Sequence, residues 1–319
     1  MGLGVAAFAF ALLAWVLSPS YFWFIALAAP FSLCFGVIQP ATLAAVTQAE
    51  AMSSRRLMPQ HWASFSVGSL AGLLAGLVSQ ALNLPPTLVF LTLFAVTLAA
   101  GVLVFITVLA PVTFDLIKSP GIGVPSQNVL FLGGLAALSM ATISIVLDWS
   151  ALWLTRDLGL AIAYGGTGIM AFNLTEIVAR LIGERLFDRL GEVWVAGWGM
   201  LLGCVVFIAV TLTGNPFLIV AGFGVFGFFS ANFVPVLFGI ASREETENPV
   251  AAVGDVNLIA FAGFLFGPPL VGFIADAISI TMCMLILGVT WAVIACILML
   301  SGKLQGRDAL AASAQAKTP

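Results

Sequence analysis

Charge is the scarcest feature of this 319-residue sequence. Asp, Glu, Lys and Arg make up 8% of it and hydrophobic residues 61%, whereas soluble domains carry about 25% charged residues. A soluble fold of this length could not bury so much apolar surface in one core. The apolar residues form continuous runs close to helical membrane-crossing length, without the alternation of a membrane barrel, so the composition predicts an all-α membrane protein.

Motifs that carry chemistry are also missing. The sequence has no H-E-x-x-H, G-x-S-x-G or Walker loop, no paired intramembrane Asp motif, and no basic arm that would indicate nucleic-acid binding. His61 is the single histidine, and its isolation favours a structural role over proton coupling. Four cysteines lie in apolar runs without a CxxC pair, which favours packing over metal binding or disulfides: Cys34, Cys204, Cys283 and Cys296. We expect no enzyme activity, cofactor or metal.

About ten transmembrane helices are predicted from the apolar runs and the polar or Pro/Gly-rich breaks between them. The runs are 3–18, 22–45, 62–82, 87–110, 128–150, 160–181, 193–212, 216–240, 251–276 and 280–300. Short uncharged breaks alternate with longer charged ones. Ten of the eleven basic residues therefore fall on one face, with Arg156 as the exception. By the positive-inside rule both termini are expected in the cytoplasm.

The chain organisation follows from these breaks. Residues 1–110 are predicted to form four helices, 111–127 a central cytoplasmic loop, 128–300 a six-helix bundle and 301–319 a disordered cytoplasmic tail. An internal repeat accompanies this division, because a shift of 196 residues places Gly76 on Gly272 and Gln80 on Asp276. The first four runs then match the last four, and 128–181 has no counterpart. This pattern predicts helices three to twelve of a twelve-helix protein, and the rival interpretation is a five-plus-five exporter.

Ionisable residues inside membrane helices are functional candidates by default. Asp148 lies near the outer end of its run, and Asp276 ends the ninth run. Glu176 and Arg180 are four residues apart, so they share a helix face and can pair. The structural alternatives are a helix-locking ion pair for Glu176 and Arg180 and a water-facing helix end for Asp276.

Isolated polar and aromatic residues within the runs are the candidates for lining a cavity. They are Gln39, Thr42, Trp149, Asn173 and Asn232. Each polar group needs a partner on another helix or water in a cavity, so hydrogen bonding between helices is the alternative role. The Gly- and Phe-rich stretch 222–238 is expected either to pack or to form an aromatic cavity wall on a Pro-interrupted helix.

The most distinctive local pattern is ARLIGERLFDRLGE at 179–192. Gly183 and Gly191 suit a tight turn, and charges of alternating sign lie between them at Glu184, Arg185, Asp188 and Arg189. Such a cluster can tie helix ends together and so favour one of two packings. An ordinary charged loop is the alternative.

Three segments in this order resemble the major facilitator superfamily: LDWSALWLTRDLG, GERLFDRLG and FGPPLVGFIAD. The branch they resemble is that of bacterial permeases related to the fucose:proton symporter. The resemblance implies two six-helix halves that alternate access to a midplane site, with this chain holding helices three to twelve. It also implies that Gly183, Asp188, Arg189 and Gly191 belong to a conformational latch. Glu192 stands where the superfamily usually has a basic residue.

The resemblance implies secondary transport of a small solute, either a sugar-like or other small metabolite or a drug. Proton coupling, a monomeric state and a multi-pass location in a bacterial cytoplasmic membrane are expected with it. Two other interpretations stay open: an N-terminally shortened, non-transporting or subunit-like membrane protein, and a ten-helix drug/metabolite-type exporter. Substrate, direction and coupling ion are not determined by the sequence.

Overall fold

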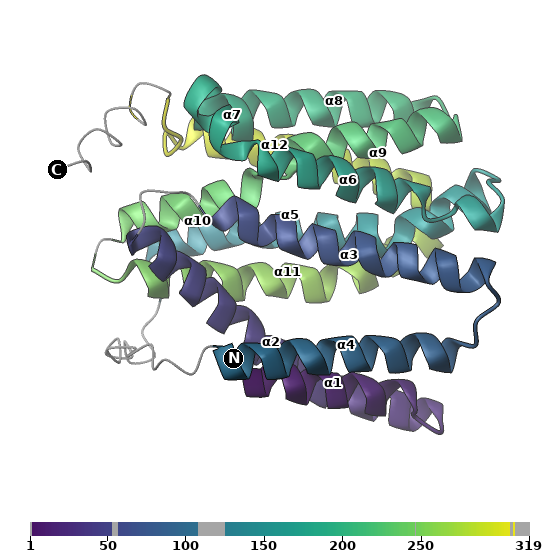
Figure 1. Ribbon diagram of the computed structural model, residues 1–319. Coiled ribbons are helices and arrows are strands. Elements are labelled where there is room, and N and C mark those ends of the chain that lie inside the picture. Colours follow the sequence, from purple (N-terminus) through teal and green to yellow (C-terminus); the bar gives the residue numbers. More distant parts are fainter. Residues whose placement is uncertain (1, 53–56, 108–124, 246, 307–308, 310–319) are drawn as a thin grey trace. The chain divides into compact units, whose positions relative to one another are not determined.

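The computed structural model describes residues 2–52, 57–107, 125–245, 247–306 and 309, and every regular element within them is helical (Figure 1). The chain divides into two compact units. The first comprises residues 1–48 and 72–124, and the second comprises residues 49–71 and 125–319. Helix α3, Met58–Ala81, therefore begins in the second unit and ends in the first.

The first unit contains α1, Gly2–Val16, most of α2, Tyr21–Met52, and α4, Pro86–Thr107. Helices α1 and α4 lie side by side, and glycines set their separation. A side chain at Gly101 would collide with the backbone of Ala6. Small residues at such contacts let membrane helices approach closely, which replaces the hydrophobic driving force that lipid does not supply.

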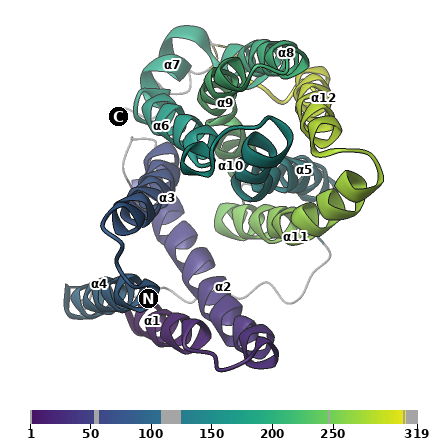
Figure 2. The same cartoon turned by 90° about the vertical axis from the view of Figure 1, so that its right-hand side faces the viewer.

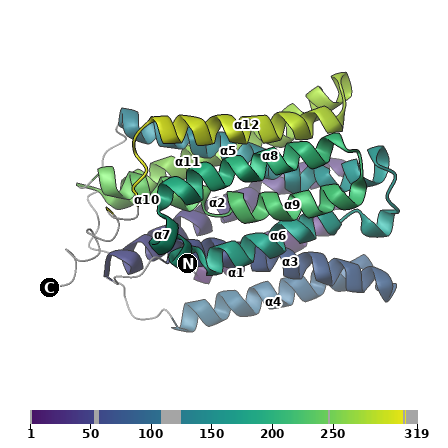
Figure 3. The ribbon, with the colours of Figure 1, turned by 90° about the horizontal axis from the view of Figure 1, so that it is seen from above.

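Among its described residues, the second unit holds eight α-helices besides the end of α2 and the start of α3: α5 Gln127–Leu152, α6 Thr167–Leu181, α7 Gly183–Leu190, α8 Gly199–Leu212, α9 Pro216–Ser230, α10 Phe233–Glu244, α11 Pro249–Ala277 and α12 Ile280–Leu300. A π-helical turn, Trp153–Asp157, follows α5, and another, Val193–Trp198, precedes α8. Viewed end-on, α6, α9, α8 and α12 form an arc, and α5 pairs with α11 (Figure 2). The arc appears as a row of helices in the view from above (Figure 3).

Local sequence explains several of these helix starts. Asn215 accepts hydrogen bonds from the backbone N–H groups of Phe217 and Leu218 and precedes Pro216, a favourable first helical residue. Asn248 and Pro249 repeat this arrangement at the start of α11. The sequence therefore fixes where α9 and α11 begin without help from tertiary contacts.

Eight helical stretches in the described residues are long and apolar enough to cross a membrane. They are Tyr21–Val46, Gln60–Ala81, Thr87–Thr107, Gln127–Asp157, Val193–Leu212, Pro216–Glu244, Pro249–Ala277 and Ile280–Leu300. The apolar helix Gly2–Val16 is shorter. The all-α membrane class is confirmed, whereas the ten-span count, the four-plus-six arrangement and the cytoplasmic termini stay predictions.

Three sequence predictions need correction: the start of one helix, the continuity of another, and the turn at 183–191. The run 160–181 is helical only from Thr167, because Gly165 and Gly166 follow a short 3-10 turn at Ile162–Tyr164. The run 216–240 comprises two helices, α9 and α10, with a break at Ala231–Asn232.

The third correction concerns the expected turn at 183–191, which is the helix α7. Its sequence, GERLFDRL, is rich in helix formers, and it buries Phe187. Gly191, at φ 80°, then ends the helix in a conformation that glycine adopts without strain. Of the other predicted segments, residues 111–124 of the central loop and 310–319 of the tail lie outside the described residues, and the domain boundaries stay predictions.

Candidate functional site

Glu176 and Arg180 form a buried ion pair on α6, as their spacing predicts. Each side chain is 6% exposed, and the guanidinium Nη2 donates to Glu176 Oε1. A charge buried in a membrane bundle is costly unless it is paired and hydrogen-bonded. Burial of this pair therefore costs free energy that its hydrogen bonds must offset.

Helix α3 supplies the next partners of this pair. Ser66 Oγ donates to Glu176 Oε2 at 2.5 Å, and Arg180 Nη1 donates to the Trp62 carbonyl at 2.7 Å and to Ser66 Oγ. The guanidinium carbon also lies 5.9 Å from the centroid of the Trp62 ring, within range of a cation–π contact. Helix α3 thus offers a hydroxyl, a carbonyl and a ring to a charge pair carried wholly by α6.

Two asparagines extend the same network. Asn173 Nδ2, one turn earlier on α6, donates to Ser69 Oγ of α3 at 3.0 Å. Asn232 Nδ2, from the break between α9 and α10, donates to the Ala179 carbonyl at 3.1 Å. We call Ser66, Asn173, Glu176, Arg180 and Asn232 the α6 polar cluster.

A second buried charge lies at the C-terminal end of α7. Glu192, 1% exposed, accepts from both terminal nitrogens of Arg243 at 2.9 Å. The backbone of Gln305 completes the site: its N–H donates to Glu192 Oε2 at 3.2 Å, and its carbonyl accepts from the Glu192 N–H at 3.0 Å. This arrangement, the Glu192 clasp, joins the segment before α8 to the end of α10 and to the segment that follows α12.

The predicted latch residues have two different environments. Gly183 is buried, and a side chain added there would meet Asn232 Oδ1 at 3.0 Å. Four charged residues of α7 are exposed, and they form no ion pair with any of the described residues: Glu184, Arg185, Asp188 and Arg189. A latch role for these four residues would therefore require contacts that this structure does not contain among the described residues.

The remaining predicted site residues are dispersed. Asp148 is exposed on α5, and Trp149 packs against α11, with ring atoms 3.5 Å from the position of a Cβ at Gly272. Asp276 is exposed near the end of α11. In the first unit, Thr42 Oγ1 donates to the carbonyls of Ile38 and Gln39, so that hydroxyl is satisfied within α2. Within the described residues of the second unit, Asp148, Trp149 and Asp276 do not join the α6 polar cluster.

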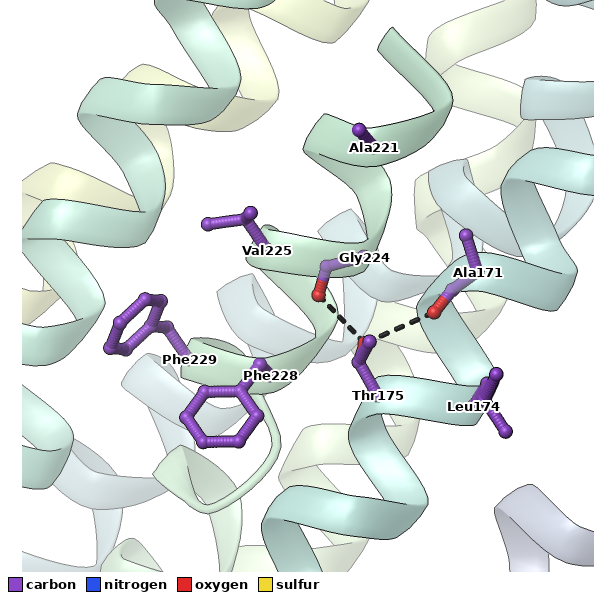
Figure 4. Close-up of a pocket in the computed structure, with 8 residues that line it drawn as sticks. All are labelled: Ala171, Leu174, Thr175, Ala221, Gly224, Val225, Phe228 and Phe229. Atoms are coloured by element: carbon purple, nitrogen blue, oxygen red, sulfur yellow. Dashed lines mark hydrogen bonds between the residues drawn. The ribbon is translucent and has the colours of Figure 1, made fainter. Parts of the chain in front are cut away.

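An apolar groove of about 530 Å³ lies between α6 and α9 (Figure 4). Thr175 stands at its centre and donates to the carbonyls of Gly224 at 2.7 Å and Ala171 at 3.0 Å. Phe228 and Phe229 flank it from α9 (Figure 4). Because its hydroxyl is satisfied by backbone and its walls are apolar, this groove does not resemble a site for a polar solute.

Sequence patterns alone miss several of these partners. Ser66 and Ser69 look like ordinary small residues of an apolar helix, and no local signal places them beside α6. In the sequence, Arg243 is explained by the positive-inside rule, and nothing near it indicates that it pairs with a buried carboxylate. Glu192 did carry a signal, because an acidic residue replaces the basic one expected after Gly191.

Comparisons with known proteins agree with this architecture. The profile of the Major Facilitator Superfamily matches residues 129–317. An uncharacterised MFS-type transporter of Yersinia pestis is 30% identical over 79% of this chain, and membrane protein MosC of Rhizobium meliloti is 30% identical over 63%. The chain spans 65% and 51% of the lengths of these two relatives.

Among solved structures, the fold is similar to that of the E. coli fucose:proton symporter FucP. The TM-score is 0.67, and the match covers 95% of this chain and 84% of that protein. At 13% identity this likeness concerns the fold alone.

Proposed function

The chain belongs to the Major Facilitator Superfamily, and from this premise we propose that it takes part in secondary transport of a small solute by alternating access. The family membership confirms the resemblance read from LDWSALWLTRDLG, GERLFDRLG and FGPPLVGFIAD. It also favours this interpretation over a drug/metabolite-type exporter. The proposed location is a bacterial cytoplasmic membrane, and the proposed working form is a monomer.

The α6 polar cluster is the observation that carries the proposal. Alternating access requires helix contacts that open and close repeatedly. Both charges of the Glu176–Arg180 pair lie on α6, and α3 contributes uncharged partners, the Ser66 hydroxyl and the carbonyl and ring of Trp62. Separation of α3 from α6 would therefore leave no unpaired ion, and such a contact can break at far lower cost than an ion pair divided between the helices.

The proposed substrate is a sugar-like or other small metabolite, and the proposed coupling ion is the proton. One solved structure with a similar fold is that of a fucose:proton symporter, which provides the precedent. The test is uptake of a panel of labelled sugars and small metabolites into proteoliposomes, with and without an imposed proton gradient. Uptake that depends on both the protein and the gradient is expected. If no compound enters faster than in protein-free vesicles, the transport proposal fails.

We further propose that α7 and Gly191 act as a latch, with Asp188 as its central carboxylate. Asp188→Asn removes the charge and keeps the size, so we expect uptake to fall several-fold while membrane insertion is unchanged. Glu247→Gln is the matched control, because Glu247 is an exposed acidic residue outside α7. Equal uptake by Asp188→Asn and the control would contradict the latch role.

A further inference from the structure

The break between α9 and α10 leaves the Ala231 carbonyl without its usual donor. Helix α9 closes with the bond from Ala231 N–H to the Gly227 carbonyl, and α10 opens with the bond from Val236 N–H to the Asn232 carbonyl. In a continuous helix, the Ala231 carbonyl would accept from residue 235. That residue is Pro235, which has no N–H.

Arg180 supplies the missing donor from α6. Its Nε donates to the Ala231 carbonyl at 3.2 Å in a buried environment. The neighbouring residue returns the contact, because Asn232 Nδ2 donates to the Ala179 carbonyl. Residues 179–180 and 231–232 thus exchange two side-chain-to-backbone hydrogen bonds, and these bonds hold the break against α6.

The same guanidinium also reaches α3. Its three nitrogens are divided among three elements: Nε to the α9–α10 break, Nη1 to Trp62 and Ser66 of α3, and Nη2 to Glu176 of α6. A guanidinium is planar, and its donors have a fixed geometry. A rotation that follows the loss of one partner therefore misaligns the others.

We propose that Arg180 is a positioning residue that transmits the separation of α3 to the α9–α10 break, so that α10 changes its angle to α9 when the α3 contact is lost. Glu176 keeps the guanidinium aimed at both partners. The inference deepens the proposed function, since it assigns a coupling residue to alternating access. The linkage itself is a property of the purified protein and needs no substrate.

The test measures the α9–α10 angle by pulsed EPR. Nitroxide labels are placed at Leu218 on α9 and Ser242 on α10, in a background where Cys34, Cys204, Cys283 and Cys296 are replaced. Ser66→Ala removes the hydroxyl that binds both charges. We expect a second distance population to grow about five-fold relative to the unsubstituted background, the shift that corresponds to one hydrogen bond of ~1 kcal/mol.

Ser64→Ala is the matched control. Ser64 lies on the same helix and is exposed, and its hydroxyl bonds only to the Gln60 carbonyl within the described residues. We expect its distance distribution to equal that of the background. An unchanged distribution in Ser66→Ala, or the same change in Ser64→Ala, would overturn the proposal.

Pro235→Ala tests the receiving end of the linkage. The substitution restores an N–H four residues after Ala231, so the break no longer depends on Arg180. In this background Ser66→Ala should have no effect on the distance, and a persisting effect would overturn the proposal.

The double variant Glu176→Gln/Arg180→Gln stays neutral and provides a second test if Ser66→Ala fails to fold. It should broaden the distance distribution even with Ser66 intact, and a narrow distribution would count against Arg180.

None of these measurements requires transport. Failure of uptake with an intact EPR response would remove the proposed function alone. Failure of the EPR response with normal uptake would remove the linkage alone.

Discussion

At the residue scale, Asp148 and Glu192 are two carboxylates in contrasting environments. Asp148 is exposed on α5. Glu192 is buried and held by Arg243 and the Gln305 backbone. A carboxylate that no charged or backbone donor engages is available for a role in transport, whereas a carboxylate with such donors is committed to structure. Substitution of Asp148 is therefore expected to affect transport, and substitution of Glu192 to affect stability.

With the proposed proton coupling, Asp148→Asn should impair gradient-driven transport. The amide cannot take up a proton, so we expect gradient-driven uptake to fall by about ten-fold or more, while exchange of labelled for unlabelled substrate continues. The comparison uses proteoliposomes with equal amounts of protein. Asp157→Asn is the control, because Asp157 pairs at 3.7 Å with the exposed Arg156 at the end of the same span. Full gradient-driven uptake by Asp148→Asn would remove Asp148 from the coupling mechanism.

Glu192→Gln should destabilise the bundle. The substitution leaves the guanidinium of Arg243 without its bidentate partner, which costs about 1–3 kcal/mol for a partly buried charged group. We expect a lower midpoint of thermal unfolding in detergent, measured by loss of the monomer peak in size-exclusion chromatography. The comparison is Glu244→Gln, because the Glu244 side chain, paired with Lys303, is 27% exposed and that of Glu192 is 1% exposed. The exchange Glu192→Arg/Arg243→Glu should recover part of the loss, and no recovery would indicate that the backbone bonds of Gln305 dominate.

At the element scale, the α5–α11 pair shows how glycine spacing on one helix becomes close packing of two. Gly263 and Gly267 of α11 face the backbone carbonyls of Ala137 and Ala141 of α5, and a side chain at either glycine would collide with them. Helices in lipid associate through such contacts, because burial of apolar surface gives no driving force there. The pairing therefore depends on the absence of specific side chains.

Gly263→Ala should separate these two helices. Its Cβ cannot fit without a backbone shift, so we expect destabilisation of about 1–3 kcal/mol, measured as a lower thermal midpoint in detergent. Gly254→Ala provides the control on the same helix, because nothing lies within 4 Å of the position of its Cβ. Equal thermal midpoints for the two variants would show that α5 and α11 can accommodate the added Cβ without loss of stability, contrary to this prediction.

At the scale of the whole molecule, the distribution of basic residues predicts the orientation in the membrane. Charged connections alternate with uncharged ones along the chain, and the uncharged ones include the turns at Asn83 and Gly214. The positive-inside rule predicts that the charged connections and both termini lie in the cytoplasm.

Reporter fusions test this orientation. A fluorescent protein fused to the C-terminus should be bright, because it folds in the cytoplasm. Alkaline phosphatase inserted at Gly214 should be active, because that enzyme matures outside the cytoplasm. Insertion at Glu247, in a charged connection, is the control and should be inactive. The opposite pattern of activities would invert the topology.

Local sequence accounts for the class of the protein, most of its helices and the spacing of its ion pair. Continuous apolar runs admit only helices in lipid, residues four apart share a face, and Asn–Pro pairs start α9 and α11. Those properties depend on neighbours in the chain. The helix α7 was also within reach of local reasoning, since GERLFDRL favours a helix over the turn that its flanking glycines suggested.

Which polar groups meet depends on the tertiary structure. Ser66 lies 110 residues before Glu176, and Glu192 lies 51 residues before Arg243, so no local pattern could join them. The role of Arg180 as a substitute donor likewise depends on where α6 passes the Pro235 break. Hydrogen bonds act over about 3 Å. The packing of the helices, rather than proximity in the sequence, therefore decides which of these groups come within bonding distance.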